Sequence, residues 1–201
     1  DAIVASVTGV IGAVMPLVKN AGVPFACYSM EEGITKNISN AVRFYPANGQ
    51  QVEMLVKALE KLKTKNVVIV HFNNEVHGAT AIALQNKLKV MGNVNVKTIA
   101  FTDQQEQYKN IAAQLLDGEV VVFLGYHNYI QAIGKAIATA KKNNVIIGGI
   151  DVPMAVTYGG MSPNELEGFI SVLPNYPTSP TDIFGEKVKD EYLALDLGGR
   201  Y

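Results

Sequence analysis

The chain has 201 residues, of which 48% are hydrophobic and 17% are charged, a composition typical of a globular protein that buries a core. The net charge is −1, so the composition carries no signature of nucleic-acid or anionic-membrane binding. The apolar runs are all shorter than the roughly 20 residues of a membrane helix. Asp1 leads directly into a strand-like run instead of a signal peptide, so we expect the chain to begin inside a fold.

Short apolar runs rich in valine and isoleucine predict the strands. In chain order these are Ala2–Val7, Val23–Cys27, Val67–Val70, Val94–Ala100, Val120–Leu124 and Val145–Ile150. The later four are continuous and not alternating, which is typical of strands buried on both faces of a parallel sheet. Cys27 is the only cysteine, and its place in a strand favours a buried, inert thiol over a nucleophile.

Segments whose apolar residues recur at helical spacing lie between these runs. One predicted buried helix face comprises Val52, Leu55, Val56, Leu59 and Leu62, and a second comprises Ile130, Ile133, Gly134 and Ile137. Alternation of strands and helices predicts an α/β fold with parallel sheets sandwiched between helices.

Two proline-containing stretches interrupt the alternation and indicate two lobes. The first runs from Arg43 to Gly49, and the second, Leu173–Pro180, holds three prolines. We therefore expect a partial N-terminal lobe in residues 1–46 and a C-terminal lobe in residues 47–173. Residues 174–201 would cross back to the N-terminal lobe.

Polar residues follow four of the predicted strands: Thr8-Gly9, Tyr28-Ser29, Gly125-Tyr126 and Asp151. In an open parallel sheet, ligands bind outside the carboxyl ends of the strands. These residues therefore predict a small-molecule pocket that is built from several loops.

The order of these landmarks resembles the type I periplasmic binding proteins, specifically the branched-chain amino-acid (Leu/Ile/Val) receptors of ABC transporters. The matching pieces span nearly the whole chain: Val4–Gly9, Ala21–Phe25, Val42–Pro46 followed by Gln50 or Gln51, Asn74–Gly78, Gly125–His127 and Gly148–Asp151. Members of that family are considerably longer, so the resemblance implies two lobes with the N-terminal lobe incomplete.

The resemblance also implies a function. The chain would be an extracytoplasmic solute-binding protein, periplasmic or extracellular, that captures a small amino-acid-like ligand between two lobes. Its partners would be that ligand and a membrane permease or receptor, with no cofactor and no nucleic acid. An incomplete lobe would expose a sheet edge, from which we expect self-association, such as a homodimer.

Each expected ligand contact has a plainer alternative. Thr8 and Gly9 would hold the ligand carboxylate at a helix N-terminus, or Thr8 would only cap that helix. Ser29 and Met30 would form a second contact loop, or an ordinary turn. Asp151 would hold the ligand ammonium, or cap a short helix at Pro153–Tyr158.

Two aromatic positions complete the expected site. Tyr126 would lie over the ligand side chain or serve only as a structural tyrosine. His77 stands where the family usually has tyrosine, and it would contact the ligand or face solvent at a helix start. His71 and His127 have no cysteine or histidine at metal-ligand spacing, so no metal site is expected.

Two other function classes remain open on these residues. The sensor domain of a signalling receptor would share the same fold. A small α/β enzyme is disfavoured because the chain has no Gly-x-Ser-x-Gly, no Gly-x-x-x-x-Gly-Lys and no Gly-x-Gly-x-x-Gly.

Overall fold

The structure is a computed structural model that describes residues 2–6, 8–45, 47–149, 151–158 and 160–173, with Thr8 and Glu32 described by their backbone alone. The predicted return of residues 174–201 to the N-terminal lobe therefore lies outside the described residues. Among the described residues, no helix combines the length and apolar character needed to cross a bilayer.

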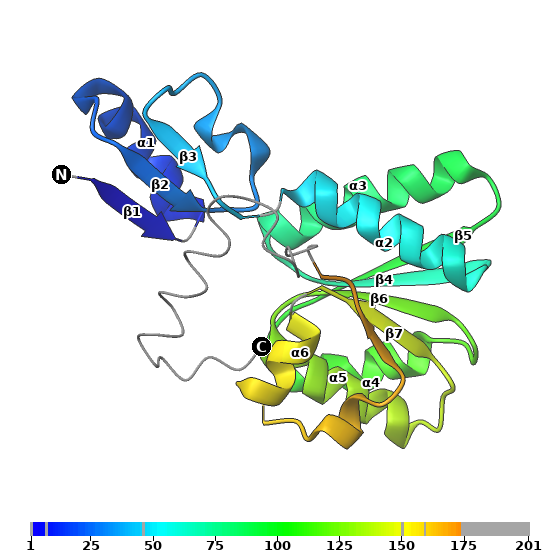
Figure 1. Cartoon of the computed structure of the whole chain (residues 1–201). Helices are drawn as coiled ribbons and strands as arrows, with labels where there is room; N and C mark the ends of the chain where they lie inside the picture. Colours follow the sequence, from blue (N-terminus) through cyan, green and yellow to red (C-terminus); the bar gives the residue numbers. More distant parts are fainter. Residues whose placement is uncertain (1, 7, 46, 150, 159, 174–201) are drawn as a thin grey trace, which may run out of the picture.

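A small parallel sheet holds the first lobe, with strand order β1-β2-β3 (Figure 1). Its elements are β1 (Ile3–Ser6), α1 (Thr8–Ala21), β2 (Phe25–Tyr28), the 3-10 helix η1 (Glu32–Thr35) and β3 (Ala41–Arg43). The first helix covers one face of this sheet, where Ile11, Met15 and Val18 pack against Phe25 and Cys27. The thiol of Cys27 is buried, as its place in a strand predicted.

A larger sheet holds the second lobe, with strand order β5-β4-β6-β7-β8, and every strand pair in it is parallel. Its elements are α2 (Asn48–Leu62), β4 (Asn66–Phe72), α3 (Glu75–Met91), β5 (Asn95–Phe101), α4 (Gln105–Gln114), β6 (Val120–Leu124), α5 (His127–Thr139), β7 (Val145–Gly148), α6 (Asp151–Thr157), the 3-10 helix η2 (Pro163–Leu166) and β8 (Phe169–Ser171). Helices α2 and α3 cover one face, and α4, α5 and α6 cover the other (Figure 1).

Central strands β4 and β6 are buried on both faces, as their continuous apolar sequences predicted. Val68 and Val121 belong to the core beneath α4 and α5, whereas Ile69 and Val122 belong to the core beneath α2 and α3. All five residues of β6 are buried. The fold prediction of an α/β protein with parallel sheets between helices is confirmed.

Three sequence expectations differ from the structure. Strand β5 is an edge strand with several exposed side chains, because only β4 pairs with it, whereas its apolar run predicted full burial. Leu62 at the end of α2 is 39% exposed, outside the predicted buried face. The three-residue strands β3 and β8 were not predicted, because so short a segment carries too little apolar pattern.

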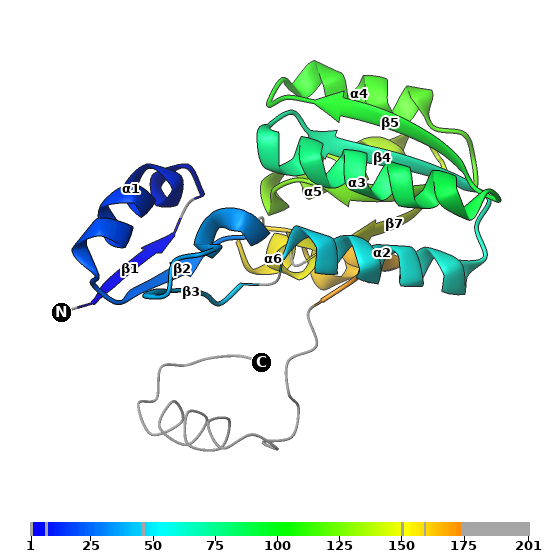
Figure 2. The ribbon, with the colours of Figure 1, turned by 90° about the horizontal axis from the view of Figure 1, so that it is seen from above.

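The two sheets lie side by side and are joined by the stretch between β3 and α2 (Figure 2). The Asn48 backbone N–H donates to the Met30 carbonyl oxygen at 2.9 Å, which ties the start of α2 to the loop after β2. Both loops thus approach the carboxyl end of the larger sheet.

Candidate functional site

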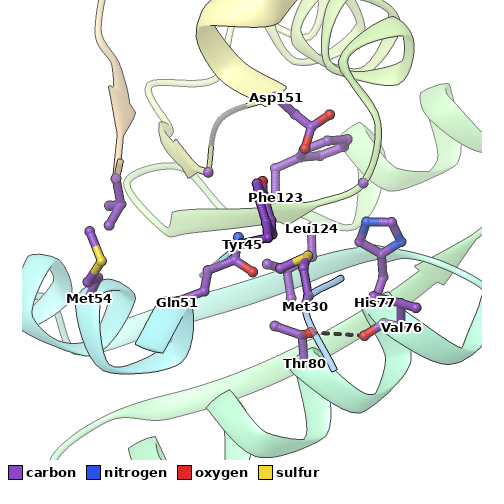
Figure 3. A pocket seen from close by; sticks show the side chains of 13 residues that line it. Met30, Tyr45, Gln51, Met54, Val76, His77, Thr80, Phe123, Leu124 and Asp151 are labelled. Carbon is purple, nitrogen blue, oxygen red and sulfur yellow. Dashed lines mark hydrogen bonds between the residues drawn. The ribbon is translucent and has the colours of Figure 1, made fainter. Parts of the chain in front are cut away.

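A pocket lies where the carboxyl ends of β6 and β7 meet the loops of the first lobe (Figure 3). Its cavity volume is about 60 Å³, and the empty space around the cavity, which includes open solvent, is about 630 Å³. The lining residues are Met30, Tyr45, Gln51, Met54, Val76, His77, Thr80, Phe123, Leu124, Gly125, Gly149, Asp151 and Val172. The pocket is therefore mostly apolar with a few polar groups, as expected of small-molecule sites.

Of the lining residues that the structure describes, Asp151 is the only one with a carboxylate. The backbone N–H of His127, the first residue of α5, donates to its Oδ1 at 3.1 Å, and the His127 imidazole Nδ1 lies 4.0 Å from the same oxygen. Burial raises the pKa of the Asp151 carboxyl, and the His127 N–H and imidazole partly offset that rise. Because a carboxylate accepts up to about four hydrogen bonds, Asp151 retains capacity for a ligand donor.

Asp151 caps a different helix from the one that the sequence suggested. Helix α6 begins at Asp151 itself, not at Pro153, so this residue does not precede the helix as its cap. Its side chain instead receives an N–H from the first residue of α5. Capping of α5 and contact with a ligand are compatible because they can use different oxygens.

His77 forms the opposite wall of the pocket, on the first turn of α3. Its Nδ1 lies 2.9 Å from Asn74 Oδ1, and that same oxygen accepts the His77 backbone N–H. Burial, assisted by His71, lowers the pKa of His77 to about 4. The imidazole is therefore neutral at neutral pH and half-buried, unlike the solvent-facing alternative.

Aromatic rings pack behind His77. The Tyr126 ring centroid lies 5.0 Å from that of His77 in an edge-on arrangement, and Asn74 Nδ2 donates to the Tyr126 hydroxyl at 3.1 Å. Phe72 stacks on Tyr129 with centroids 5.1 Å apart. Tyr126 thus stands next to the pocket wall and supports His77, although it is not among the lining residues.

Helices α2 and α3 supply the polar floor of the pocket. The Thr80 hydroxyl donates to the Val76 carbonyl oxygen at 2.9 Å and also lies 3.2 Å from Asn48 Oδ1. Gln51 projects from α2 into the pocket (Figure 3). A Cβ at Gly149 would lie 2.6 Å from Gln51 Nε2. The absence of a Cβ at Gly149 is what lets the Gln51 amide enter the pocket.

The first lobe contributes Met30 and Tyr45 to the pocket. Arg43 organises both loops, because its guanidinium donates to the carbonyl oxygens of Ser29 and Tyr45. The Tyr45 ring also packs on Tyr28, with centroids 4.1 Å apart. The Arg43 guanidinium thus holds backbone segments near the pocket, and within the part of the chain that the structure describes no lysine or arginine lines the pocket.

The predicted site residues fall into three groups. Met30, His77 and Asp151 line the pocket, and Tyr126 contacts His77 beside it. Ser29 is buried and does not line the pocket; its hydroxyl accepts the Glu31 N–H at 3.1 Å, as in an ordinary turn. Thr8 and Gly9 lie at the start of α1, and Gly9 is not among the described residues that line the pocket.

Sequence reasoning missed several lining residues, among them Tyr45, Gln51 and Met54. Tyr45 and Gln51 belong to the crossing that carried the family resemblance, so that motif was a usable signal. Met54 follows Gln51 by three residues on α2 and shares its helix face, which the apolar pattern alone could not distinguish from core. Among the described residues, no group of three acidic, histidine or cysteine side chains could hold a metal ion.

Searches with family models and among curated proteins found no match. Solved structures of similar fold were found. A leucine-binding protein, LivK, from Thermotoga maritima superposes with a TM-score of 0.76 at 19% identity, covering 98% of this chain and 57% of that one. An extracellular ligand-binding receptor from Verminephrobacter eiseniae gives 0.71 at 12% identity, covering 100% of this chain and 59% of that one.

A solute-binding protein of an ABC transporter from Rhodopseudomonas palustris, in complex with 3,4-dihydroxybenzoic acid, gives a TM-score of 0.61 at 16% identity, covering 74% of this chain and 43% of that one. These neighbours are type I periplasmic binding proteins, and the likeness shows that this chain has their fold. The chain spans less than three fifths of the length of each of these three proteins.

Proposed function

We propose that this chain is an extracytoplasmic solute-binding protein that captures a small amino-acid-like ligand between its two lobes for an ABC transporter. The observation that carries the proposal is the pocket at the carboxyl end of the larger sheet, lined by Met30 and Tyr45 from one lobe and by His77 and Asp151 from the other. Ligands of open α/β sheets bind at this edge. The fold neighbours are binding proteins, which supports binding over catalysis.

The charges of the lining residues favour a ligand that carries a cation. Asp151 is acidic, and His77 is neutral at neutral pH because burial lowers its pKa to about 4. Among the described residues, no basic side chain lines the pocket. A ligand ammonium would satisfy the carboxylate, and a charge-assisted hydrogen bond contributes about 1.5–3 kcal/mol. A carboxylate placed beside Asp151 would instead be repelled.

The ligand carboxylate is assigned to the N-terminus of α1, at Thr8 and Gly9. Free backbone N–H groups and the helix dipole favour an anion there. Because Gly9 is not among the described residues that line the pocket, the assignment requires the lobes to close. Met30, Met54 and Tyr45 would then surround the apolar side chain of the ligand.

Isothermal titration calorimetry on the full chain tests the proposal. We expect at least one of the twenty standard amino acids to bind, and 4-hydroxybenzoate, the ligand of one Rhodopseudomonas palustris neighbour, not to bind, because it has no cationic group. Binding of 4-hydroxybenzoate in preference to every amino acid, or no binding of any amino acid, would overturn the proposed ligand class.

Transport and sensing use the same binding event. The neighbours include both ABC-transporter solute-binding proteins and an extracellular ligand-binding receptor, so a sensor domain with a receptor partner is the second candidate. A permease encoded beside this gene would support transport. A kinase-like or membrane-spanning segment in the same gene would support sensing. Either role places the protein in the periplasm or outside the cell.

A further inference from the structure

The hydrogen bonds around Asn74 fix which nitrogen of the His77 ring carries a proton. Asn74 Oδ1 accepts the backbone N–H of His77 at 2.9 Å, and a backbone N–H can only donate. At the other end of the same amide, Nδ2 donates to the Tyr126 hydroxyl at 3.1 Å. The atom that lies 2.9 Å from His77 Nδ1 is therefore the amide oxygen, an acceptor. It follows that Nδ1 carries a proton and donates to this oxygen.

The second ring nitrogen of His77 is an acceptor. Burial, with a smaller contribution from His71, lowers the pKa of His77 to about 4, so the imidazole holds a single proton at neutral pH. A neutral imidazole with its proton on Nδ1 has an unprotonated Nε2, which accepts a hydrogen bond and donates none. Within the described residues, the imidazole forms its hydrogen bond through Nδ1 alone.

The His77 ring is held with this acceptor toward the pocket. Nδ1 faces Asn74, the residue that precedes α3, and Nε2 occupies a different edge of the ring. Figure 3 shows the imidazole rising from α3 beside the cavity, below the loop that carries Asp151. The rings of Tyr126 and Phe72 pack against the imidazole nearly at right angles, with centroids 5.0 and 6.4 Å away. These contacts fix the orientation of the ring.

Two polar side chains on opposite walls of the pocket can therefore only accept hydrogen bonds. One is the Asp151 carboxylate, which has no donor when it is ionised, and the other is His77 through Nε2. The Thr80 hydroxyl already donates to the Val76 carbonyl oxygen at 2.9 Å, whereas the Gln51 amide can both donate and accept. A ligand in this pocket meets an acceptor on each wall, and a buried acceptor left without a donor weakens binding.

We propose that the ligand donates two separate hydrogen bonds, one from its ammonium to Asp151 and one from a side-chain hydroxyl or amide N–H to His77 Nε2. This inference rests on the proposed function, because it concerns the same ligand in the same pocket. It narrows the class from amino acids in general to those whose side chain carries a hydrogen-bond donor. His77 is then a residue that determines specificity.

Calorimetry with three pairs of amino acids of similar size tests the proposal. The pairs are threonine and valine, glutamine and methionine, and tyrosine and phenylalanine, in each of which only the first has a side-chain donor. In at least one pair, the first member should bind about ten- to a hundredfold more tightly, because the second leaves Nε2 unpaired.

Two variants assign that preference to a single nitrogen. His77→Phe keeps an aromatic ring but has no acceptor, and it should reduce the preference to about twofold or less. His71→Gln is the matched control, because His71 is not among the described residues that line the pocket, and it should retain the preference. Equal binding within all three pairs, or a preference that His77→Phe retains, would overturn the proposal and leave the proposed function standing.

Nitrogen-15 NMR of the full chain at pH 7 gives a readout that does not depend on the choice of ligand. Long-range proton–nitrogen spectra should show a protonated Nδ1 and an unprotonated Nε2 for His77 in the free chain. The Nε2 resonance should shift when the tightest-binding amino acid of the three pairs is added. A free chain with the proton on Nε2 would overturn the proposal.

Benzoate and 4-hydroxybenzoate separate a failure of this inference from a failure of the proposed function. If no amino acid binds, the amino-acid class is wrong. Tighter binding of 4-hydroxybenzoate than of benzoate, abolished in His77→Phe, would then still support a ligand donor at His77 Nε2. Equal binding of the two benzoates in that case, or no binding of any of these probes, would overturn the donor as well.

Discussion

The burial of the Asp151 carboxylate lowers the stability of the fold and strengthens the binding of a cationic ligand. Its carboxylate lies in a largely apolar pocket, where burial raises its pKa, and the same burial strengthens its attraction to a cationic ligand. Because the folded-state pKa lies above the ordinary value of 3.8, the unfolded chain loses this proton first as the pH rises. The free energy of unfolding therefore decreases as the pH rises through the window above 3.8.

Asp151→Asn should consequently weaken ligand binding without destabilising the fold. The amide oxygen can still accept the His127 N–H, and no buried charge remains. We expect affinity for the best amino acid to fall ten- to a hundredfold, about 1.4–2.8 kcal/mol, with an equal or higher melting temperature at pH 7. Calorimetry and thermal denaturation measure the two quantities.

Asp117→Asn is the matched control for that substitution. Asp117 is an exposed carboxylate bonded to Asn143, and it is not among the pocket residues. The Asp117→Asn substitution should therefore leave the affinity for the ligand unchanged. Unchanged affinity in Asp151→Asn as well would show that Asp151 only holds the start of α5.

The lowered pKa of His77 predicts that its contribution to the free energy of unfolding is lost in mild acid. Its folded-state pKa of about 4 lies below the ordinary value of 6.5, so the unfolded chain takes up the proton first as the pH falls. The free energy of unfolding should therefore decrease between pH 6.5 and pH 4. Urea denaturation across this range should show a smaller decrease for His77→Gln than for the parent chain.

His71→Gln separates the two causes of the His77 shift. Burial is the larger cause and the positive charge of His71 the smaller one, so this variant should retain most of the decrease. Because the raised pKa of Asp151 acts in the opposite direction over part of this range, the comparison with His77→Gln decides: identical pH dependences of the parent chain and His77→Gln from pH 6.5 to pH 4 would contradict the burial of a neutral imidazole at this position.

At the scale of the elements, β7 and α6 meet through two glycines that tolerate side chains differently. A Cβ at Gly148 would lie 2.7 Å from Val152 Cγ2, on a β-branched side chain with little freedom to move. A Cβ at Gly149 would meet only the end of the flexible Gln51 side chain. Gly148→Ala should therefore lower the free energy of unfolding by about 1–3 kcal/mol, and Gly149→Ala by much less.

Gly149→Ala should instead act on binding, because the displaced Gln51 amide would occupy pocket space and lower ligand affinity. Gly78→Ala is the control for both. Gly78 lies inside α3 with no atom within 4 Å of an added Cβ, so it should stabilise the chain by about 0.5–1 kcal/mol. Urea denaturation and calorimetry measure these effects, and equal destabilisation by Gly148→Ala and Gly149→Ala would contradict the packing described.

The elements differ in how well the sequence predicted them. Strands β4 and β6 were predicted because their burial on both faces imposes an unbroken apolar run, which a sequence displays directly. The edge position of β5 was not predicted, because an apolar run that includes Val96 and Ile99 looks the same in an edge strand as in a central strand until the pairing partners are known. Within the site, Asp151 and His77 were predicted from strand-end and motif positions, whereas Thr80 is a helix residue whose role depends on where α3 packs.

For the whole molecule, the pocket lies at the junction of two lobes that are joined, within the described residues, by the stretch between β3 and α2. Its enclosed volume of about 60 Å³ is well below the roughly 300–1,000 Å³ of typical ligand sites. We therefore expect a ligand to extend from this cavity into the wider opening, between the first-lobe loops and the edge of the larger sheet. Contacts from both lobes strengthen only when that opening narrows around the ligand.

Ligand should accordingly shift the chain toward a more compact state, by the difference in its affinity for the open and closed forms. We expect small-angle X-ray scattering to show a smaller radius of gyration for the saturated chain than for the free chain. At the ligand concentration that half-saturates the parent, Asp151→Asn should stay nearer the free value, because its affinity is ten- to a hundredfold lower, and it should reach the compact value only at correspondingly higher concentration. A scattering profile that does not change when calorimetry reports saturation would mean that the ligand binds the second lobe alone and that Thr8 and Gly9 take no part.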